Sequence, residues 1–433
     1  MASSISHQAA AVVPTSVQAV SNASDTATGS QKATEYWSNY FRAVLKPLFE
    51  SVGGYTPSEQ EAQIQFLNDH VAPVLGPVPS EPFDAFNMPY NCSPLETSIN
   101  FTTKGVPKAR VWMNLGKPLD QTRFLPGVAE KDKEVLQSIA RATGADTQWM
   151  DCLMKTLFLT PAQMEAVRAR NGPVWPFSLF CFDFDGADRT MRAYFPAVPR
   201  GGRTRTEVCL DAIEKLEPAG DKLKPALNHV LGYLGNNKYE AALHMLGVDL
   251  VDPERARLKV YLDVNSNSWN AARDVMTLGG RLNDEVTLKG VEILRSIWPL
   301  LRDEPESTDD DFSKPPVIPS VSFPGQQYSI EITAGNSIPE IKIYAPLMQF
   351  TKTTQRAEQN MYKILQKLNH PWGSNGKLET AMKAMCGEEM VRGLGVVTFS
   401  YSEKKGAYTT FYFSPLTSYD DKVQFNYRDL SKA

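Results

Sequence analysis

The chain carries two kinds of hydrophobic periodicity, which follow each other in a repeating order. Apolar residues three and four positions apart, typical of amphipathic helices, are separated by short stretches of alternating apolar and polar residues, typical of strands. Helices are predicted at residues 33–72 (as two helices, the second from about 58 to 71), 130–143, 161–170, 205–217, 222–235, 269–278, 283–301, 354–368 and 376–387. Strands are predicted at residues 96–101, 109–114, 177–184, 190–195, 257–262, 327–333, 340–345, 394–401 and 408–413.

The order of these elements indicates an antiparallel architecture. Eight of the predicted strands form four hairpins, and the sequence identifies no partner for the strand at 257–262. A unit of helix, two antiparallel strands and helix repeats, whereas parallel α/β folds alternate single strands with helices. We therefore predict an α+β fold, an antiparallel ten-stranded β-barrel with a solvent-filled lumen and a surrounding ring of α-helices. Residues 34–433 are expected to form this single domain, after a disordered tail at residues 1–33.

The polar faces of the strands carry a recurring order of cations and aromatic rings. Alternate side chains of a strand share a face, so Arg257, Lys259 and Tyr261 point the same way. Taken alone, this face is typical of a solvated edge strand. The arrangement recurs, however, in Arg110 with Trp112 and Asn114, in Arg192 with Tyr194, in Lys342 with Tyr344, and in Tyr408 with Thr410 and Tyr412.

In a barrel wrapped by helices the apolar strand faces must point outward, so the cations and tyrosines are expected to line the lumen. Like charges a few ångströms apart repel by about 4 kcal/mol per pair at an effective dielectric of 20, so such a cluster predicts a bound anion of high charge. A pyrophosphate fits Arg and Lys donors. Nearby ring faces can stabilise a cation by about 0.5–2 kcal/mol each. Together these features favour the ionisation of an allylic pyrophosphate.

Glu96 is the one carboxylate that the strand pattern places with these groups. Alternation puts Glu96, Ser98 and Asn100 on one face, which is the lumen side if Arg110 faces inward on the partner strand. Two roles remain open at this point. Glu96 could be a structural counter-ion for the cations, or it could accept the N–H of an aromatic acceptor and so raise the nucleophilicity of that ring.

Composition excludes several other classes of function. The formal net charge of the 433 residues is −4, so no global basic field attracts nucleic acid or an anionic membrane. The five cysteines and five histidines are scattered, which predicts reduced thiols in a cytoplasmic protein and no metal site. No signal peptide or transmembrane segment is predicted. Asp309, Asp310 and Asp311 resemble a magnesium-binding run, but they lie in a Glu/Asp/Pro/Ser-rich loop without a second acidic motif, which predicts a solvated charge run.

From about residue 34 to 430 the chain resembles the fungal aromatic prenyltransferases of the dimethylallyltryptophan synthase family, which have the αββα (ABBA) barrel. The resemblance is carried by Leu95-Glu96, Arg192–Pro196, Arg257–Tyr261, Val275–Gly280, Pro339–Pro346 and Tyr412–Pro415. It implies transfer of a dimethylallyl group from its pyrophosphate to an indole, such as a tryptophan-containing cyclic dipeptide or an indole alkaloid, without obligatory magnesium or another cofactor. The expected partners are these two small molecules.

The resemblance also implies roles for individual residues. Those implied to bind pyrophosphate are Arg110, Arg192, Arg257, Lys259 and Lys342, and those implied to shield the carbocation are Tyr194, Tyr261, Tyr344 and Tyr412. Glu96 matches the glutamate that takes the indole N–H. The family often has Gln at the position of Lys342 and a tyrosine near Val396. The lysine of tryptophan C4-prenylating members has no counterpart at residues 177–179, which leaves the base for the final proton unassigned and favours an acceptor other than free tryptophan.

Several alternatives stay open at the level of sequence. The same fold could prenylate free tryptophan, tyrosine or another phenolic or xanthone acceptor, or the chain could be a non-catalytic barrel that binds an amphiphilic ligand. The bulk of Gln326, Gln327 and Tyr328 indicates a five-carbon donor. The sequence does not determine the ring position, regular versus reverse prenylation, or the choice between a monomer and a homodimer.

Overall fold

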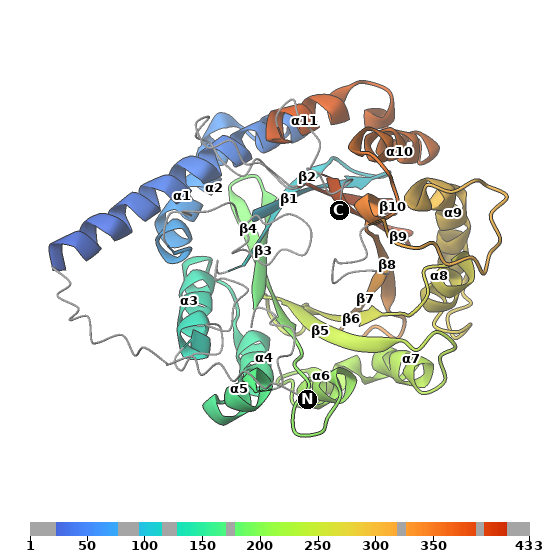
Figure 1. Ribbon diagram of the computed structural model, residues 1–433, viewed down its shortest axis with the longest axis horizontal. Coiled ribbons are helices and arrows are strands. Elements are labelled where there is room, and N and C mark those ends of the chain that lie inside the picture. The colour runs from blue at the N-terminus through green and yellow to red at the C-terminus, as the bar shows by residue number, and fades with distance from the viewer. Residues whose placement is uncertain are drawn as a thin grey trace, which may run out of the picture.

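The computed structural model describes residues 23–76, 95–114, 128–169, 178–317, 326–386 and 394–413, and in these ranges ten strands close into an antiparallel barrel (Figure 1). Each strand pairs with its neighbours in sequence, and β1 closes the barrel against β10. The predicted ten-stranded architecture is therefore confirmed. The strands are β1 Leu95–Thr102, β2 Lys108–Asn114, β3 Leu179–Asp185, β4 Asp188–Pro196, β5 Ala242–Asp249, β6 Arg257–Asp263, β7 Gln327–Thr333, β8 Glu340–Ala345, β9 Leu394–Ser402 and β10 Gly406–Phe413.

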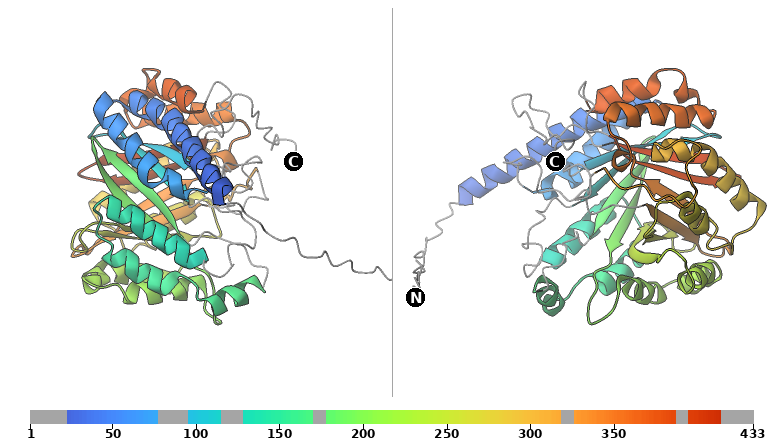
Figure 2. Two further views of the ribbon diagram at one scale, coloured as in Figure 1. Left: turned by 90° about the vertical axis from the view of Figure 1, so that its left-hand side faces the viewer. Right: turned by 45° about the vertical axis from the view of Figure 1, so that its right-hand side comes forward.

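Helices form a ring around the outside of the barrel, as Figures 1 and 2 show. Several begin with a threonine capping box, in which the threonine hydroxyl accepts from the third helical N–H and a Glu or Gln there accepts from the threonine N–H. The described helices are α1 Ala23–Val52, α2 Pro57–His70, α3 Val128–Ala142, α4 Gln148–Leu157, α5 Pro161–Arg168, α6 Arg205–Glu214, α7 Lys224–Leu234, α8 Trp269–Met276, α9 Glu285–Arg302, α10 Thr354–Lys367 and α11 Lys377–Cys386.

The hydrophobic core lies between the outer face of the sheet and the helices. Outward-facing residues such as Val111, Ala193 and Val260 are fully buried in one large cluster with the apolar faces of the helices. A separate, smaller buried cluster inside the barrel contains Tyr194 and Tyr261. The two clusters confirm that the apolar strand face points toward the helices and the face with cations and tyrosines points inward.

Three elements differ from the prediction. The partner of β6 is β5, whose alternation is hidden in the sequence because a bulge between Leu243 and Met245 shifts the register and Gly247 adds no side chain. Helix α4 has no counterpart among the predicted helices. Helix α1 begins at Ala23, inside the segment expected to be a disordered tail, and residues 1–22 of that segment lie outside the described ranges.

Candidate active site

The direction of the strands places charged and aromatic side chains at different depths in the barrel. Each even-numbered strand begins after a hairpin turn, so its first residues lie at one end of the barrel, here called the hairpin end, and its last residues lie at the other, the loop end. On β6, Tyr261 follows Arg257 by four residues, which places it roughly 13 Å closer to the loop end. The same order holds for Arg192 and Tyr194 on β4 and for Lys342 and Tyr344 on β8.

Three carboxylates lie among the five predicted cations and link them together. Asp183 pairs with both Arg110 and Arg192. Asp249 Oδ1 lies 2.9 Å from Nε of Arg192, and its Oδ2 lies 2.6 Å from Nε of Arg257. We call the whole set the charge chain; it consists of Arg110, Asp183, Arg192, Asp249, Arg257, Lys259, Glu331 and Lys342.

Glu331 joins Arg257 to Lys342 and so completes the charge chain. Its carboxylate lies 2.8 Å from Nη1 of Arg257 and 2.9 Å from Nζ of Lys342. Lys259 Nζ is 3.4 Å from Asp249 Oδ1. The five cations therefore converge as predicted, and three carboxylates that the sequence interpretation did not single out pair with them. Five positive and three negative charges leave a net charge of +2 when Lys259 is protonated.

Strand alternation held an unused signal for Asp183 and Glu331, which lie in predicted strands, but not for Asp249, whose strand β5 was hidden by its bulge. The cations lie on even-numbered strands, and Asp183, Asp249 and Glu331 lie on β3, β5 and β7, each between two cation-bearing strands. Glu331 shares an interior face with Ser329, which opposes Lys342 across the β7–β8 pair. Opposite charges on neighbouring strands stabilise each other, so the sheet itself supplies the counter-ions.

The electrostatic environment gives Lys259 an unusual titration. Burial, together with the positive charge of Arg192, lowers the pKa of Lys259 to about 7, although Asp249 acts in the opposite direction. Burial would likewise lower the pKa of Lys342, but Glu331 outweighs it and raises that pKa well above the ordinary value. Lys259, unlike Lys342, is therefore charged or neutral near neutral pH according to whether an anion lies beside it.

A continuous row of aromatic rings lies on the loop-end side of the charge chain. We call it the aromatic belt, and its centroid distances are 4.4 Å for Trp112–Tyr194, 6.0 Å for Tyr194–Tyr261, 5.8 Å for Tyr261–Tyr344 and 6.4 Å for Tyr344–Tyr412. The structure thus brings together the four predicted tyrosines and adds Trp112, which sequence reasoning placed on the same face as Arg110 without giving it a role. Val396 is buried and contributes no ring. Compared with the predicted set of four tyrosines, the belt gains a ring at Trp112 and gains none at Val396.

Gly247 fixes the position of one ring of the belt. A Cβ atom at this position would lie 2.5 Å from Cδ1 of Tyr194, closer than real Cβ contacts allow. The Tyr194 ring therefore packs against the bare backbone of β5. Its hydroxyl lies 3.5 Å from Sγ of Cys181, a second interior group that sequence reasoning did not single out.

Tyr408 lies beside the charge chain and is not part of the aromatic belt. The ammonium of Lys342 lies 4.9 Å from its ring centroid. Burial alone would raise the pKa of Tyr408, but Arg110 and Lys342 outweigh it and hold this pKa below its ordinary value. Its hydroxyl is thus a good hydrogen-bond donor to an anion.

Glu96 faces the interior, as predicted, but apart from the charge chain. It opposes Trp112 across the β1–β2 pair, and burial raises its pKa to about 8. Among the described residues it has no ion-pair partner, whereas each carboxylate of the charge chain has at least two. The structural counter-ions are therefore Asp183, Asp249 and Glu331, and Glu96 remains available for another hydrogen-bonding partner.

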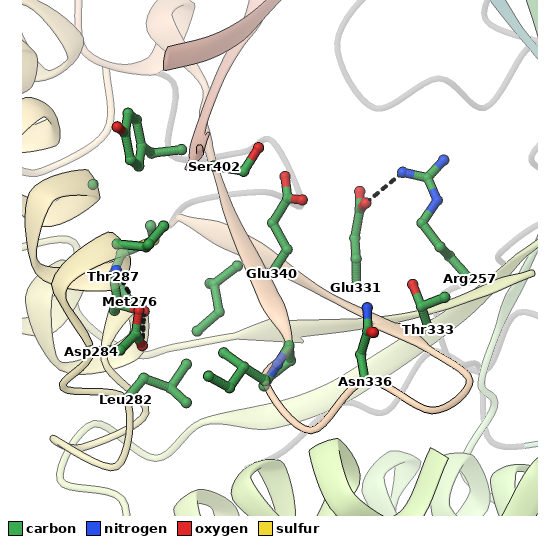
Figure 3. Close-up of a pocket in the computed structure, with 16 residues that line it drawn as sticks. Arg257, Met276, Leu282, Asp284, Thr287, Glu331, Thr333, Asn336, Glu340 and Ser402 are labelled. Carbon is green, nitrogen blue, oxygen red and sulfur yellow. Dashed lines mark hydrogen bonds and ion pairs between the residues drawn. The ribbon is translucent and has the colours of Figure 1, made fainter. Parts of the chain in front are cut away.

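A pocket of about 320 Å³ reaches the charge chain from the hairpin end (Figure 3). Arg257 and Glu331 line it together with Glu340, and Asn336 of the β7–β8 turn lies at its edge. The Arg257 side chain is accordingly 27% exposed, whereas that of Lys259, two residues further in, is 3% exposed. The outermost cation of the site is therefore accessible to solvent and the inner one is not.

Other predicted features lie away from this interior. Asp310 pairs with Arg295 of α9 in an exposed loop outside the barrel, and the part of the chain that the structure describes has no cluster of His, Cys, Asp and Glu placed to hold a metal ion. Tyr328 opposes Leu262 and is buried in the outer core, so its ring does not face the barrel interior, and it carries no part of the expectation about donor length. No described helix is long and apolar enough to cross a membrane.

A closed antiparallel barrel with an interior charge chain beside an aromatic belt defines a prenyltransferase of the barrel class. The family model for tryptophan dimethylallyltransferase matches residues 33–380, and the chain belongs to this family. It is similar to the indole prenyltransferase tdiB of Emericella nidulans, with 41% identity over 397 residues that cover 88% of this chain and 95% of the relative.

Two further comparisons agree with this assignment. The indole diterpene prenyltransferase terF of Tolypocladium album is 32% identical over 414 residues, which cover 89% of this chain and 94% of the relative. Among solved structures, AnaPT from Neosartorya fischeri has the same fold, with a TM-score of 0.72 at 21% identity over 89% of this chain and 95% of that one. The predicted fold class and family are thereby confirmed.

Proposed function

We propose that this chain transfers a dimethylallyl group from dimethylallyl pyrophosphate to an indole acceptor by electrophilic aromatic substitution. The observation that carries the proposal is the position of the charge chain directly beside the aromatic belt, with Lys259 Nζ only 5.8 Å from the ring centroid of Tyr194. If the charge chain holds the pyrophosphate, the allylic carbon that separates from it lies over the aromatic belt. The printed descriptions of relatives such as tdiB and terF, which name indole prenyltransferases, support the acceptor class.

The charge chain would bind the pyrophosphate and stabilise it as it leaves. Its net charge of +2 suits a polyanion, and the guanidinium groups offer bidentate donors to phosphate oxygens. Preorganised donors aimed at developing charge are usually the largest catalytic contribution in such sites. Because side-chain cations supply the positive charge, we expect activity without magnesium or another metal, with no cofactor required.

The aromatic belt would stabilise the allyl cation and exclude water from it. Each ring face can contribute about 0.5–2 kcal/mol to a desolvated cation. The rings of Tyr194 and Tyr261 are almost completely buried, so water reaches this surface poorly. Exclusion of water limits hydrolysis of the cation to an alcohol.

Glu96 would accept the N–H of the indole. It lies next to the belt at Trp112 and Tyr412, and no other charged group of the described interior pairs with it. Its raised pKa of about 8 means that an N–H donor competes with a proton for the carboxylate. A hydrogen bond from the indole N–H increases the electron density of the ring and so its nucleophilicity toward the cation.

The test is incubation with dimethylallyl pyrophosphate in EDTA, with tryptophan, tryptophan-containing cyclic dipeptides and phenols as acceptors, read by mass spectrometry. We expect a gain of one dimethylallyl group on an indole, and loss of this product in Glu96→Ala and Lys259→Ala while circular dichroism stays native. Surface variants Glu254→Ala and Lys222→Ala, whose side chains pair with each other outside the barrel, are matched controls. Undiminished indole prenylation by both interior variants, or prenylation of phenols alone, would contradict the proposal.

A further inference from the structure

The proposed reaction ends with loss of a proton from the alkylated ring, and the structure holds a histidine–aspartate pair in contact with the aromatic belt. Nδ1 of His244 on β5 lies 3.3 Å from Oδ2 of Asp263 at the end of β6. Nε2 of the same ring lies 3.4 Å from Nε2 of Gln327. The imidazole is in contact with the aromatic belt, at 6.2 Å between the ring centroids of His244 and Tyr261.

The β-bulge of β5 is what brings His244 to this position. Leu243 opposes Leu262 in the outer core and Met245 opposes Tyr261 on the interior face, so His244 is the extra residue between them. Without the bulge, strict alternation would have turned either His244 or Met245 outward. The backbone of the bulge is tied down by the N–H of Ala197, which donates to the carbonyl of His244 at 2.8 Å.

The His244–Asp263 pair and the cations proposed to bind the donor lie at opposite ends of the barrel interior. Arg257 and Asp263 are the first and last residues of β6, roughly 20 Å apart along the strand. The pyrophosphate cations are therefore at the hairpin end, the histidine–aspartate pair is at the loop end, and the belt lies between them. A ring carbon that receives the prenyl group from the hairpin side presents its hydrogen toward the loop side.

Glu96 lies on the opposite wall from this pair. It belongs to β1, which is four strands from β5 and five from β6 around the closed barrel of ten. An acceptor in the barrel can thus be held by its N–H on one wall and be deprotonated at carbon from the other. Two other interior groups are less suited as the base: Lys259 lies in the charge chain, and burial raises the pKa of the Cys181 thiol.

We propose that His244 is the base that accepts the ring proton, and that Asp263 orients it; this inference rests on the proposed function. The bond between the alkylated ring carbon and its hydrogen breaks, its electron pair restores the aromatic ring, and the proton is bound by Nε2 of His244. The Asp263 carboxylate, 3.3 Å from Nδ1, favours the tautomer that carries its proton on Nδ1, which leaves the lone pair on Nε2, and it stabilises the imidazolium that forms. The Asp263 side chain is 48% exposed, so the proton can pass to solvent.

The charged surroundings agree with a base that is neutral before the reaction. Burial lowers the pKa of His244, with Arg205 of α6 acting in the same direction and Asp263 in the opposite one. The other neighbours of the imidazole, Gln327 on β7 and Tyr261 on β6, carry no charge near neutral pH. His244 is therefore free to accept a proton near neutral pH, and it is 13% exposed in the folded chain.

The test compares His244→Gln and Asp263→Asn with wild type, using dimethylallyl pyrophosphate and tryptophan or a tryptophan-containing cyclic dipeptide, each with ordinary or deuterated indole ring. His229→Gln on the outer helix α7 is the matched control. For wild type we expect little deuterium isotope effect. For His244→Gln we expect a fall in kcat of about 10²-fold, the usual contribution of a general base, with a primary isotope effect and partial rescue by added imidazole. Asp263→Asn should show the same isotope effect with a smaller loss.

The alternatives have distinct outcomes. A raised KM with unchanged kcat and no isotope effect in His244→Gln would mean that the residue only contacts the acceptor, and would overturn the proposal. Attachment of the prenyl group to the ring nitrogen would do so too, because no carbon-bound hydrogen is then lost. If His244→Gln does not fold, as judged by circular dichroism, the isotope effect of Asp263→Asn decides. Absence of any prenylated indole with wild type would instead refute the proposed function itself.

Discussion

Replacement of Asp249 by asparagine tests whether the charge chain is held together by its own carboxylates. The Asp249 side chain is 8% exposed and contacts Arg192, Arg257 and Lys259 at 2.9, 2.6 and 3.4 Å. The substitution keeps the shape of the side chain but removes its charge. The net charge of these eight side chains, the charge chain, then rises from +2 to +3, since five cations face two carboxylates instead of three.

The size of the effect follows from general magnitudes. Removing one partner of a buried ion pair costs about 3–5 kcal/mol, because the remaining charges are left buried without compensation. With an unfolding entropy of about 2.1 cal/mol/K per residue over roughly 400 residues, this corresponds to a fall in Tm of about 4–6 °C. The surface variant Asp221→Asn, whose side chain is 86% exposed beside Lys224, is the control and should change Tm very little.

The assay is differential scanning calorimetry of Asp249→Asn, Asp221→Asn and wild type, with and without inorganic pyrophosphate. Bound pyrophosphate supplies the negative charge that the variant lacks, so it should raise the Tm of Asp249→Asn by more than that of wild type. An unchanged Tm without ligand, or an equal pyrophosphate shift in the two proteins, would refute the view that these carboxylates act as counter-ions when no pyrophosphate is bound.

Two further predictions concern the belt and the inner lysine. Gly247→Ala should displace the Tyr194 ring, because the new Cβ would lie 2.5 Å from it, and the share of donor hydrolysed to dimethylallyl alcohol should rise. Gly235→Ala is the control, because its Cβ would meet only ordinary contacts. Equal alcohol formation in the two variants would contradict the shielding role. With a pKa of about 7, Lys259 loses its charge as pH rises, so kcat/KM for the donor should fall above pH 7. Lys259→Arg stays charged and should lack this decline; a decline that persists in that variant would assign it to another group.

The strand pattern by itself determined the architecture and much of the site. Because side chains alternate strictly along a strand, Arg257, Lys259 and Tyr261 had to share a face, and repetition of that face in hairpins between helices required a barrel with its polar side inward. The depth of cations and rings along each strand followed from their order in the chain. These are local relations, which one strand displays without its neighbours.

Only the tertiary structure decided which groups oppose one another across strands. The pairing of Asp183, Asp249 and Glu331 with the cations depends on the register between neighbouring strands, which no single strand reveals. The bulge in β5 concealed the partner of β6 and also turned His244 toward Asp263. Sequence separation conveys nothing about such contacts, because closing the sheet into a barrel brings β1 and β10 together from opposite ends of the chain.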